Sequence, residues 1–361
     1  MGPLVLVLPG LAGGESDSIL AEAGSELRRI AACGEVYRIV DSFDPPEPGW
    51  LGLEPSIPCP SQGILTVAAL GADPPASSVH FAVALRSVLD ETMQDITPVP
   101  TTEELAIVLR EASRLNDSKL TFVKGHHLEH GLVWEEGSVD MQTRSPEEAL
   151  GQPIQACLPE GDGELKLRRF IDDSVNLLSE LELNRRRIDE GHLPINLLWP
   201  WGQGFRFPMP VLPLQRGIPA HVHSRSLRLR GLARLVGYRH GDVGQLGPLM
   251  RPDWGYLRST LEAPTPHVVV LDDFARLRGK GQLDEAIWLL GEFDRHFFRH
   301  IDPRRHQLDV IATGPLSLAL SIDPQREQGD TAPFEERIWE DRRTPARGLD
   351  TLVRERLSVR A

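Results

Sequence analysis

Short runs of consecutive apolar residues alternate along much of the chain with stretches in which apolar residues recur at helical spacing. Such short apolar runs are typical of strands buried on both faces of a parallel sheet. Six segments have this pattern: Leu4–Leu8, Val36–Val40, Ile195–Trp201, Ala220–His223, His267–Leu271 and Leu308–Ala312. Helical spacing is found over residues 16–33, 225–236, 253–262 and 282–299. The alternation predicts an α/β core with a mostly parallel central sheet flanked by helices.

The middle of the chain lacks this regular alternation. Its strand-like segments are Ser78–Ala84, Leu120–Lys124 and Gly131–Trp134. A helical pattern lies among them, near residues 102–115. We therefore expect an inserted α+β domain at residues 75–163, between core segments at residues 1–74 and 164–335. The charged residues 336–361 are expected to form a loosely attached C-terminal tail.

Composition and charge narrow the class of protein. The chain of 361 residues is 40% hydrophobic and 25% charged, which is ordinary for a soluble globular protein. Its formal net charge of −13 argues against a nucleic-acid or anionic-membrane partner, since both require clustered basic surface. The arginine-rich stretch Arg225–Arg234 is short, and we expect it to form a solvated helix face.

The cysteines and the N-terminal segment favour the cytoplasm. Cys33, Cys59 and Cys157 are widely separated and odd in number, which suits a reducing compartment. The apolar segment Leu4–Leu8 is too short for a signal peptide or a membrane span and ends at Pro9.

The most unusual segment is "NRRRIDEGHLPINLLWPWGQG" at residues 184–204, which holds two of the seven tryptophans one proline apart. A strand that ends in a glycine turn at the carboxyl edge of a parallel sheet is a common ligand-binding position. The alternative is that the tryptophans fill core beneath the insertion.

This segment resembles the hallmark of the archaeal-type cofactor-independent phosphoglycerate mutases, which belong to the alkaline phosphatase superfamily. The matching residues are Asn184, Arg187, Gly191, Asn196, Trp199, Trp201, Gly202, Gln203 and Gly204. Other segments in the family's order include "LGADP" at 70–74 and "FVKGHHLEHGLVW" at 122–134, which contains His130. The resemblance covers about residues 1–335. It implies an alkaline phosphatase-like core with an inserted domain, and it implies a cleft for a small phosphorylated metabolite.

The resemblance assigns cleft residues to both parts of the chain. The residues expected to face this cleft are Asn184, Arg187, Asn196, Trp201, Gly202, Gln203, Gly204 and His130. The family's reaction uses a serine that takes the phosphoryl group from 3-phosphoglycerate and returns it to the 2-hydroxyl. Two divalent metal ions, which lie about 4 Å apart in such sites, activate the nucleophile and stabilise the transferred charge. They require carboxylate and imidazole ligands at the strand ends.

Most of these metal ligands are missing from the expected positions. The first strand ends in Pro9-Gly10 instead of an Asp-Gly, and the last strand ends in Thr313-Gly314 instead of an Asp-His. The segment "DDFARLRGKG" at 272–281 has Asp272 and Asp273 but no following histidine, and Asp253 is the loose candidate for another carboxylate. The segment "QGDTAPFEE" also lacks the family's last histidine. Asp253, Asp272 and Asp273 remain as the candidate metal ligands.

The nucleophile also departs from the pattern. Counting back nine residues from Gly71 leads to Gln62, so Ser61 is one place away from the expected serine. The aspartate that should follow the serine is Gln62. Ser61 is the candidate nucleophile, although a serine without a base or metal ion is poorly activated.

Two histidine-rich segments offer other imidazoles. His126, His127 and His130 lie in "GHHLEH", where strand and turn geometry points them in different directions. His221 and His223 in "AHVHS" lie on one face of a strand. A sheet-end residue with a partially buried neighbour is the simpler interpretation of this pair.

Two functions remain open. In the first, the chain is a diverged phosphoglycerate mutase-like protein that has lost the two-metal site and is retained, without a cofactor, as a binding or regulatory module. In the second, it is a phosphomutase or phosphatase that converts 3-phosphoglycerate to 2-phosphoglycerate, or acts on another small phosphorylated metabolite, with Mn or Zn in a rearranged site. The sequence contains no Walker-type Gly-Lys-Ser/Thr, Gly-x-Ser-x-Gly or Cys-x-x-Cys motif.

Overall fold

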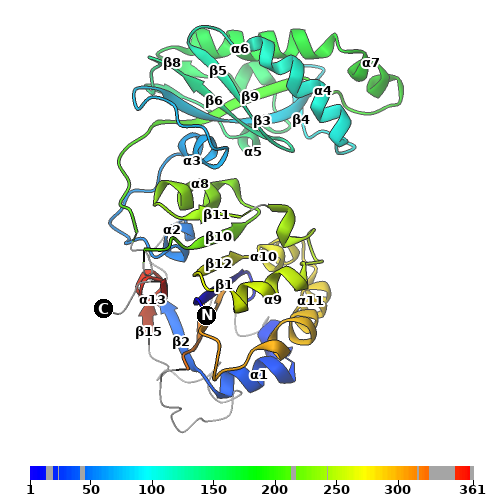
Figure 1. Ribbon diagram of the computed structural model, residues 1–361. Coiled ribbons are helices and arrows are strands. Elements are labelled where there is room, and N and C mark those ends of the chain that lie inside the picture. Colours follow the sequence, from blue (N-terminus) through cyan, green and yellow to red (C-terminus); the bar gives the residue numbers. More distant parts are fainter. Residues whose placement is uncertain are drawn as a thin grey trace. The chain divides into compact units, whose positions relative to one another are not determined.

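The chain folds into two compact units (Figure 1). Unit 1 comprises residues 1–58 and 210–361, and unit 2 comprises residues 59–209. The computed structural model describes residues 1–13, 19–22, 24–40, 45–212, 217–241, 243–314, 317–324 and 346–357.

Unit 1 is built on an eight-stranded sheet in the order β11-β10-β12-β1-β13-β14-β2-β15. Its strands are β1 (Leu4–Pro9), β2 (Glu35–Val40), β10 (His221–Ser224), β11 (Arg239–His240), β12 (His267–Val270), β13 (Leu308–Thr313), β14 (Leu318–Ile322) and β15 (Ala346–Gly348). All neighbouring pairs are parallel except those that β14 makes with β13 and β2. Every residue of β1 is buried, as expected for a central parallel strand covered on both faces. The prediction of a mixed α/β core with a mostly parallel sheet is therefore confirmed.

Helices cover this sheet because their apolar residues repeat at helical spacing and form one buried stripe each. They are α1 (Ser25–Ala32), α2 (Glu47–Trp50), α8 (Leu227–Leu235), α9 (Trp254–Glu262), α10 (Asp273–Gly279), α11 (Leu283–His296) and α13 (Leu349–Leu357). Short 3-10 helices lie at Ile19–Glu22, Val243–Leu246 and Phe298–His300. Phe274, Phe293, Phe297 and Phe298 join the main core cluster beside the strands.

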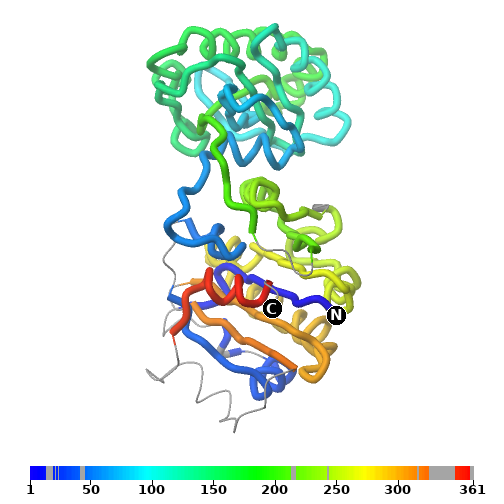
Figure 2. Tube along the Cα trace, turned by 60° about the vertical axis from the view of Figure 1, so that its left-hand side comes forward, coloured from blue at the N-terminus to red at the C-terminus, as the bar shows by residue number. Residues whose placement is uncertain are grey.

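Strands from the two ends of the chain lie side by side in unit 1, as Figure 2 shows for the blue β1 and β2 and the orange β13 and β14. The expectation of a loose tail is wrong for residues 346–357: β15 pairs with β2, and α13 buries Leu352 and Val353. Arg356 of α13 holds the buried carboxylate of Asp309 through two hydrogen bonds of 2.7 and 2.8 Å. Residues 336–345 and 358–361 lie outside the described residues.

Unit 2 is built on an antiparallel sheet in the order β4-β3-β6-β5, with β9 paired to β3. Its strands are β3 (Val79–Leu89), β4 (Thr92–Gln94), β5 (Leu120–His126), β6 (Glu129–Trp134) and β9 (Leu197–Phe205), with β7 (Met141–Gln142) and β8 (Glu160–Gly161) as a separate pair. Its helices are α3 (Gln62–Ala69), α4 (Thr102–Ala112), α5 (Pro146–Ala149), α6 (Glu164–Ser179) and α7 (Glu182–Asp189), with 3-10 helices at Ser113–Leu115 and Ile154–Cys157.

The boundaries of unit 2 differ from the expected insertion at residues 75–163. On the N-terminal side, α3 packs against β3 and β9, and on the C-terminal side α6 packs against β9. The tryptophan-rich segment therefore does not join the parallel sheet as expected, because β9 runs antiparallel to β3. A buried apolar run predicts a strand but does not identify its partner strand.

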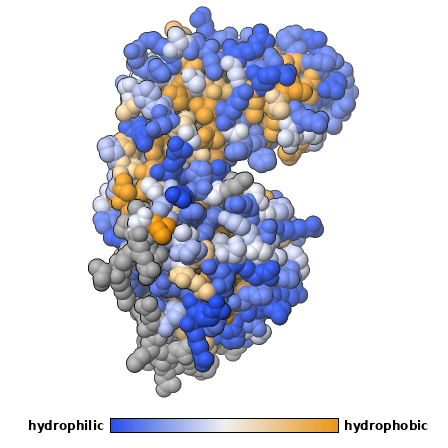
Figure 3. Space-filling model, in the orientation of Figure 1, coloured by the Kyte–Doolittle hydropathy of each residue, from blue (hydrophilic) through white to orange (hydrophobic). Residues whose placement is uncertain are grey.

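The surface in view in Figure 3 is mostly hydrophilic over unit 1, while unit 2 carries several hydrophobic patches among hydrophilic residues. None of the helices in the described ranges is long and apolar enough to cross a membrane.

Candidate functional site

The carboxyl ends of the parallel strands in unit 1 bring several polar residues together. Strand β10 is followed by Arg225, and the neighbouring strand β12 is followed by Asp272 and Asp273. Because neighbouring parallel strands end at the same edge, Arg225 meets Asp272 and Asp273 there, although they lie 47 and 48 positions further along the chain. This edge is where ligands bind in open α/β sheets.

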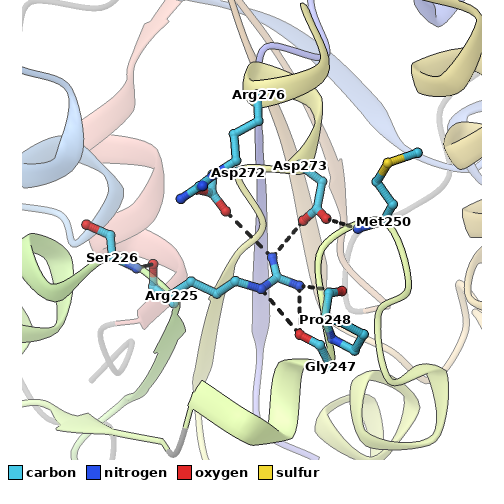
Figure 4. Close-up of polar contacts among 9 residues, drawn as sticks. Arg225, Ser226, Gly247, Pro248, Met250, Asp272, Asp273 and Arg276 are labelled. Carbon is cyan, nitrogen blue, oxygen red and sulfur yellow. Dashed lines mark hydrogen bonds and ion pairs between the residues drawn. The ribbon is translucent and has the colours of Figure 1, made fainter. Parts of the chain in front are cut away.

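Arg225 lies at the centre of this edge (Figure 4). Its Nη1 donates to Oδ2 of Asp273 at 2.7 Å and lies 3.6 Å from Oδ1 of Asp272. Its Nη2 donates to the carbonyl oxygens of Gly247 and Pro248 at 3.1 and 3.2 Å. The side chain is only 11% exposed, so the expectation of a solvated helix face is wrong for Arg225.

The two aspartates are both neutralised by arginines. Asp273 is 1% exposed; besides the bond from Arg225, its Oδ1 accepts the backbone N–H of Met250 at 2.6 Å. Asp272 accepts from Nε of Arg276 at 2.6 Å, one turn further along α10. A buried carboxylate is stable when it is paired and hydrogen-bonded in this way.

The central strands β1 and β13 contribute no carboxylate or imidazole at their ends. Pro9 ends β1, and the N–H of the following Gly10 donates to the carbonyl of Thr313, which ends β13. The carbonyl of Gly10 accepts from Nε of Arg278 at 2.9 Å, so a second guanidinium lies here. A side chain on Gly10 would also meet the backbone of Ala275 at 2.5 Å, so α10 closely approaches this turn.

These residues do not fit a pair of divalent cations. Such a centre needs several anionic or imidazole ligands with free lone pairs. At this edge Asp273 has both oxygens engaged, and the guanidinium groups of Arg225 and Arg278 are fixed cations. Asp253 acts as the N-cap of α9, where its Oδ1 accepts from the N–H of Tyr256 at 2.9 Å.

Ser61 lies in unit 2 as the N-cap residue of α3, so it belongs to a different unit from Asp272 and Asp273. Its Oγ is buried and has no hydrogen-bond partner among the described residues. The glycine turn of β9 lies against it: a Cβ on Gly204 would be 2.4 Å from this Oγ, and one on Gly202 would be 2.9 Å from Cβ of Gln62. The two glycines thus leave the space that the start of α3 occupies.

The motif residues Asn184 and Arg187 fix the backbone that leads into β9. Asn184 is fully buried, donates to the carbonyls of Leu178 and Ile195, and accepts from the N–H of Ile195. Arg187 is 3% exposed and bonds to Oε1 of Glu104 at 2.8 Å, with further bonds to two backbone carbonyls.

The remaining motif residues bond mainly to the neighbouring backbone. Asn196 accepts from the N–H of Val88 at 2.9 Å and donates to its carbonyl at 3.1 Å. Gln203 donates to the carbonyl of Met141, and Nε1 of Trp199 donates to the carbonyl of Arg144. Trp201 packs, partly buried, against the apolar cluster that contains Trp199.

His130 lies on β6, the strand expected for it, and is fully buried. Its Nδ1 accepts the N–H of Gly125 at 2.9 Å, and its Nε2 has no hydrogen-bond partner within the described ranges. Burial, with a smaller contribution from His126, lowers the pKa of His130 to about 3. The imidazole is therefore neutral at physiological pH.

Sequence reasoning missed Arg225 as the central residue of this edge. Its only local signal is its position directly after a buried strand, and its partner lies 48 residues away.

Comparison with known proteins relates both units to one family. The sequence model described as "2,3-bisphosphoglycerate-independent phosphoglycerate mutase" matches residues 50–184, which include α3 and most of unit 2 but none of β10, β12 and β13. The enzyme of that name from Methanothrix thermoacetophila is 26% identical over 299 residues, covering 78% of this chain and 73% of the relative. "2,3-bisphosphoglycerate-independent phosphoglycerate mutase 2" of Methanothermobacter thermautotrophicus is 24% identical over 314 residues, covering 82% and 77%.

Two solved structures share the fold over nearly the whole chain. The cofactor-independent phosphoglycerate mutase from Thermoplasma acidophilum superposes with a TM-score of 0.57 at 17% identity, covering 99% of this chain and 98% of its own. A protein from Pyrococcus horikoshii superposes with a TM-score of 0.67 at 13% identity, covering 100% and 99%.

Proposed function

Because this chain belongs to the 2,3-bisphosphoglycerate-independent phosphoglycerate mutase family, we propose that it is a diverged member that has lost two-metal phosphoryl transfer and is retained as a binding or regulatory module. One observation carries the proposal: the guanidinium of Arg225 occupies the edge of the sheet between Asp272 and Asp273. A fixed cation there repels a metal ion, and its ion pair with Asp273 occupies a carboxylate that would otherwise be available to bind the metal.

The ligand class follows from the family. Its relatives are named for action on phosphoglycerate, so a small phosphorylated metabolite is the proposed ligand of the module. The motif residues Asn184, Asn196 and Gln203 are proposed to preserve the shape of unit 2 around this ligand. Their hydrogen bonds to backbone groups support that role.

One observation favours the enzymatic alternative. Ser61 keeps a buried hydroxyl without a hydrogen-bond partner among the described residues, at the N-terminus of α3. A hydroxyl in that state is available for reaction if a base or metal ion activates it. In this alternative the chain is a phosphomutase or phosphatase with Ser61 as nucleophile and Mn or Zn as cofactor.

Turnover assays of purified protein decide between the two. We expect no conversion of 3-phosphoglycerate to 2-phosphoglycerate and no release of phosphate, with or without added Mn²⁺. Turnover that Ser61→Ala abolishes would establish the enzymatic alternative. Ser78→Ala is the matched control, because Ser78 is also a buried serine of unit 2 whose Oγ has no described partner.

A binding assay tests the module itself. 3-Phosphoglycerate, 2-phosphoglycerate and inorganic phosphate are titrated into the protein by calorimetry. Saturable binding of a phosphoglycerate without turnover supports the proposal, whereas absence of any binding contradicts the proposed ligand class.

A further inference from the structure

A cluster of three histidines lies in unit 1, on the neighbouring strands β10 and β12. His221 and His267 are the first residues of the parallel strands β10 and β12 and are directly opposite each other in the register. His223 lies two residues after His221 and therefore on the same face of the sheet. His221 and His267 thus begin their strands and His223 is the third residue of β10, whereas Arg225, Asp272 and Asp273 follow the carboxyl ends of β10 and β12.

The three imidazoles lie close enough to share one ion. One ring nitrogen from each of the three residues lies within 4.8 Å of the other two. Nε2 of His223 and Nδ1 of His267 are 2.9 Å apart, and these two rings are stacked with their planes at 9°. Ligands of a tetrahedral zinc ion with Zn–N bonds of about 2.0–2.1 Å are about 3.3 Å apart, so small ring rotations would complete the arrangement.

Oxygen atoms hold the other nitrogen of both buried rings. The hydroxyl of Tyr256 in α9 is 3.0 Å from Nδ1 of His223, and Oγ1 of Thr265 is 3.0 Å from Nε2 of His267. Metal-binding histidines usually have such an oxygen partner on the second nitrogen, which fixes the ring and its tautomer. Gly241 makes room for this arrangement, because a Cβ there would be 2.3 Å from Nδ1 of His223.

We propose that His221, His223 and His267 form a binding site for one divalent transition-metal ion, with Zn²⁺ as the best match. Three imidazoles without a carboxylate are a ligand set that suits Zn²⁺, Cu²⁺, Ni²⁺ or Co²⁺ and not Mg²⁺ or Ca²⁺. His221 is only partly buried, so the ion can enter from its side and a water molecule or an external ligand can complete the coordination.

The positions of the ring protons differ between the metal-free and the metal-bound cluster. Without metal, the Tyr256 hydroxyl donates to Nδ1 of His223, Nε2–H of His223 donates to Nδ1 of His267, and Nε2–H of His267 donates to Thr265. When an ion binds Nε2 of His223, the ring proton moves to Nδ1 and is donated to the Tyr256 oxygen. Both rings stay neutral, and no proton needs to leave the protein.

One nearby charge opposes the ion. Arg239 is the register partner of His221 on β11 and is exposed at the end of the sheet. Its guanidinium repels a bound cation and therefore weakens binding. Removing this charge with Arg239→Ala should tighten binding severalfold.

The proposal is tested by titrating Zn²⁺ and Co²⁺ into the metal-free chain of 361 residues, with calorimetry for Zn²⁺ and visible absorption for Co²⁺. We expect one ion per chain, a tetrahedral Co²⁺ spectrum and a higher Tm with Zn²⁺. His221→Asn, His223→Asn and His267→Asn should each weaken binding by about 10-fold or more, and Tyr256→Phe by about 10-fold. His221→Asn is decisive if the buried variants fail to fold, because His221 is only partly buried.

The matched control is the double substitution His126→Asn/His127→Asn, which removes the exposed pair of the other histidine-rich segment. Unchanged binding in this control supports the proposal. Failure of the wild-type protein to bind, binding that survives His221→Asn, or loss of binding in the double control overturns it. Because none of these measurements uses turnover or Ser61, their outcome is separate from that of the proposed function.

Discussion

The guanidinium of Arg225 donates to Oδ2 of Asp273 over 2.7 Å at the carboxyl edge of the parallel sheet in unit 1. Both side chains are largely buried, at 11% and 1% exposure. Removing one partner of a buried ion pair leaves the other charge without compensation in a poorly solvated place.

Arg225→Met should therefore lower the free energy of unfolding by about 3–5 kcal/mol. Adding Asp273→Asn should restore part of it, because the uncompensated charge is then gone. Urea unfolding of the single and double variants measures both effects. The control is Arg276→Met, whose side chain is 55% exposed and should cost less than about 1 kcal/mol. Equal costs for Arg225→Met and Arg276→Met would contradict this assignment.

A second buried ion pair anchors the C-terminal helix. Arg356 of α13 holds Asp309 of β13 with two bonds and also donates to Oγ of Ser321. Arg356→Met should destabilise the protein by about 3–5 kcal/mol and increase hydrogen exchange in α13. Arg347→Met removes the more exposed pair with Glu355 and should cost less than about 1 kcal/mol. Normal protection of α13 in Arg356→Met would show that this bridge does not anchor the helix.

Asn184 should contribute to the stability of unit 2. Its side chain makes three hydrogen bonds to buried backbone groups at the entry to β9. Asn184→Ala leaves those groups unpaired and should cost about 2–4 kcal/mol in urea unfolding. Arg185→Ala changes the exposed neighbouring residue and should cost less than about 0.5 kcal/mol. If the two variants were equally stable, the structural role of this motif residue would be refuted.

The stability of unit 2 should decrease in mild acid, in part because of His80. This residue is 2% exposed, and neither ring nitrogen has a hydrogen-bond partner in the described part of the chain. Burial, with a smaller contribution from Arg206, lowers the pKa of His80 from 6.5 to about 4. Between these values the unfolded chain binds the extra proton, so stability is fully present above pH 6.5 and is lost as the pH falls toward 4.

At pH 5 the loss from His80 should be on the order of 2 kcal/mol. His80→Phe removes the contribution of His80 and should reduce, but not abolish, the dependence of the urea midpoint on pH between 7 and about 5, because the buried His130 remains. His127→Asn, at an exposed turn, should leave that dependence as it is in the wild type. An unchanged slope in His80→Phe would mean that other groups carry the acid sensitivity.

The sequence by itself determined the elements whose signal is local. Buried apolar runs marked β1, β12 and β13, and helical spacing marked α9 and α11. The tryptophan-rich string at residues 184–204 resembles the hallmark of the family, and the family model matches the preceding part of the chain, residues 50–184. The sequence also showed that the first and last strands of the core end in Pro9 and Thr313 and not in a carboxylate residue.

Only the tertiary structure decided which of these elements meet. An apolar run buries equally well in either sheet, so the assignment of β9 to unit 2 depends on its pairing with β3. His267 joins His221 and His223 only because β10 and β12 are neighbours, and Asp273 meets Arg225 for the same reason. Strand order brings together residues more than 40 positions apart, and local spacing carries no information about that order.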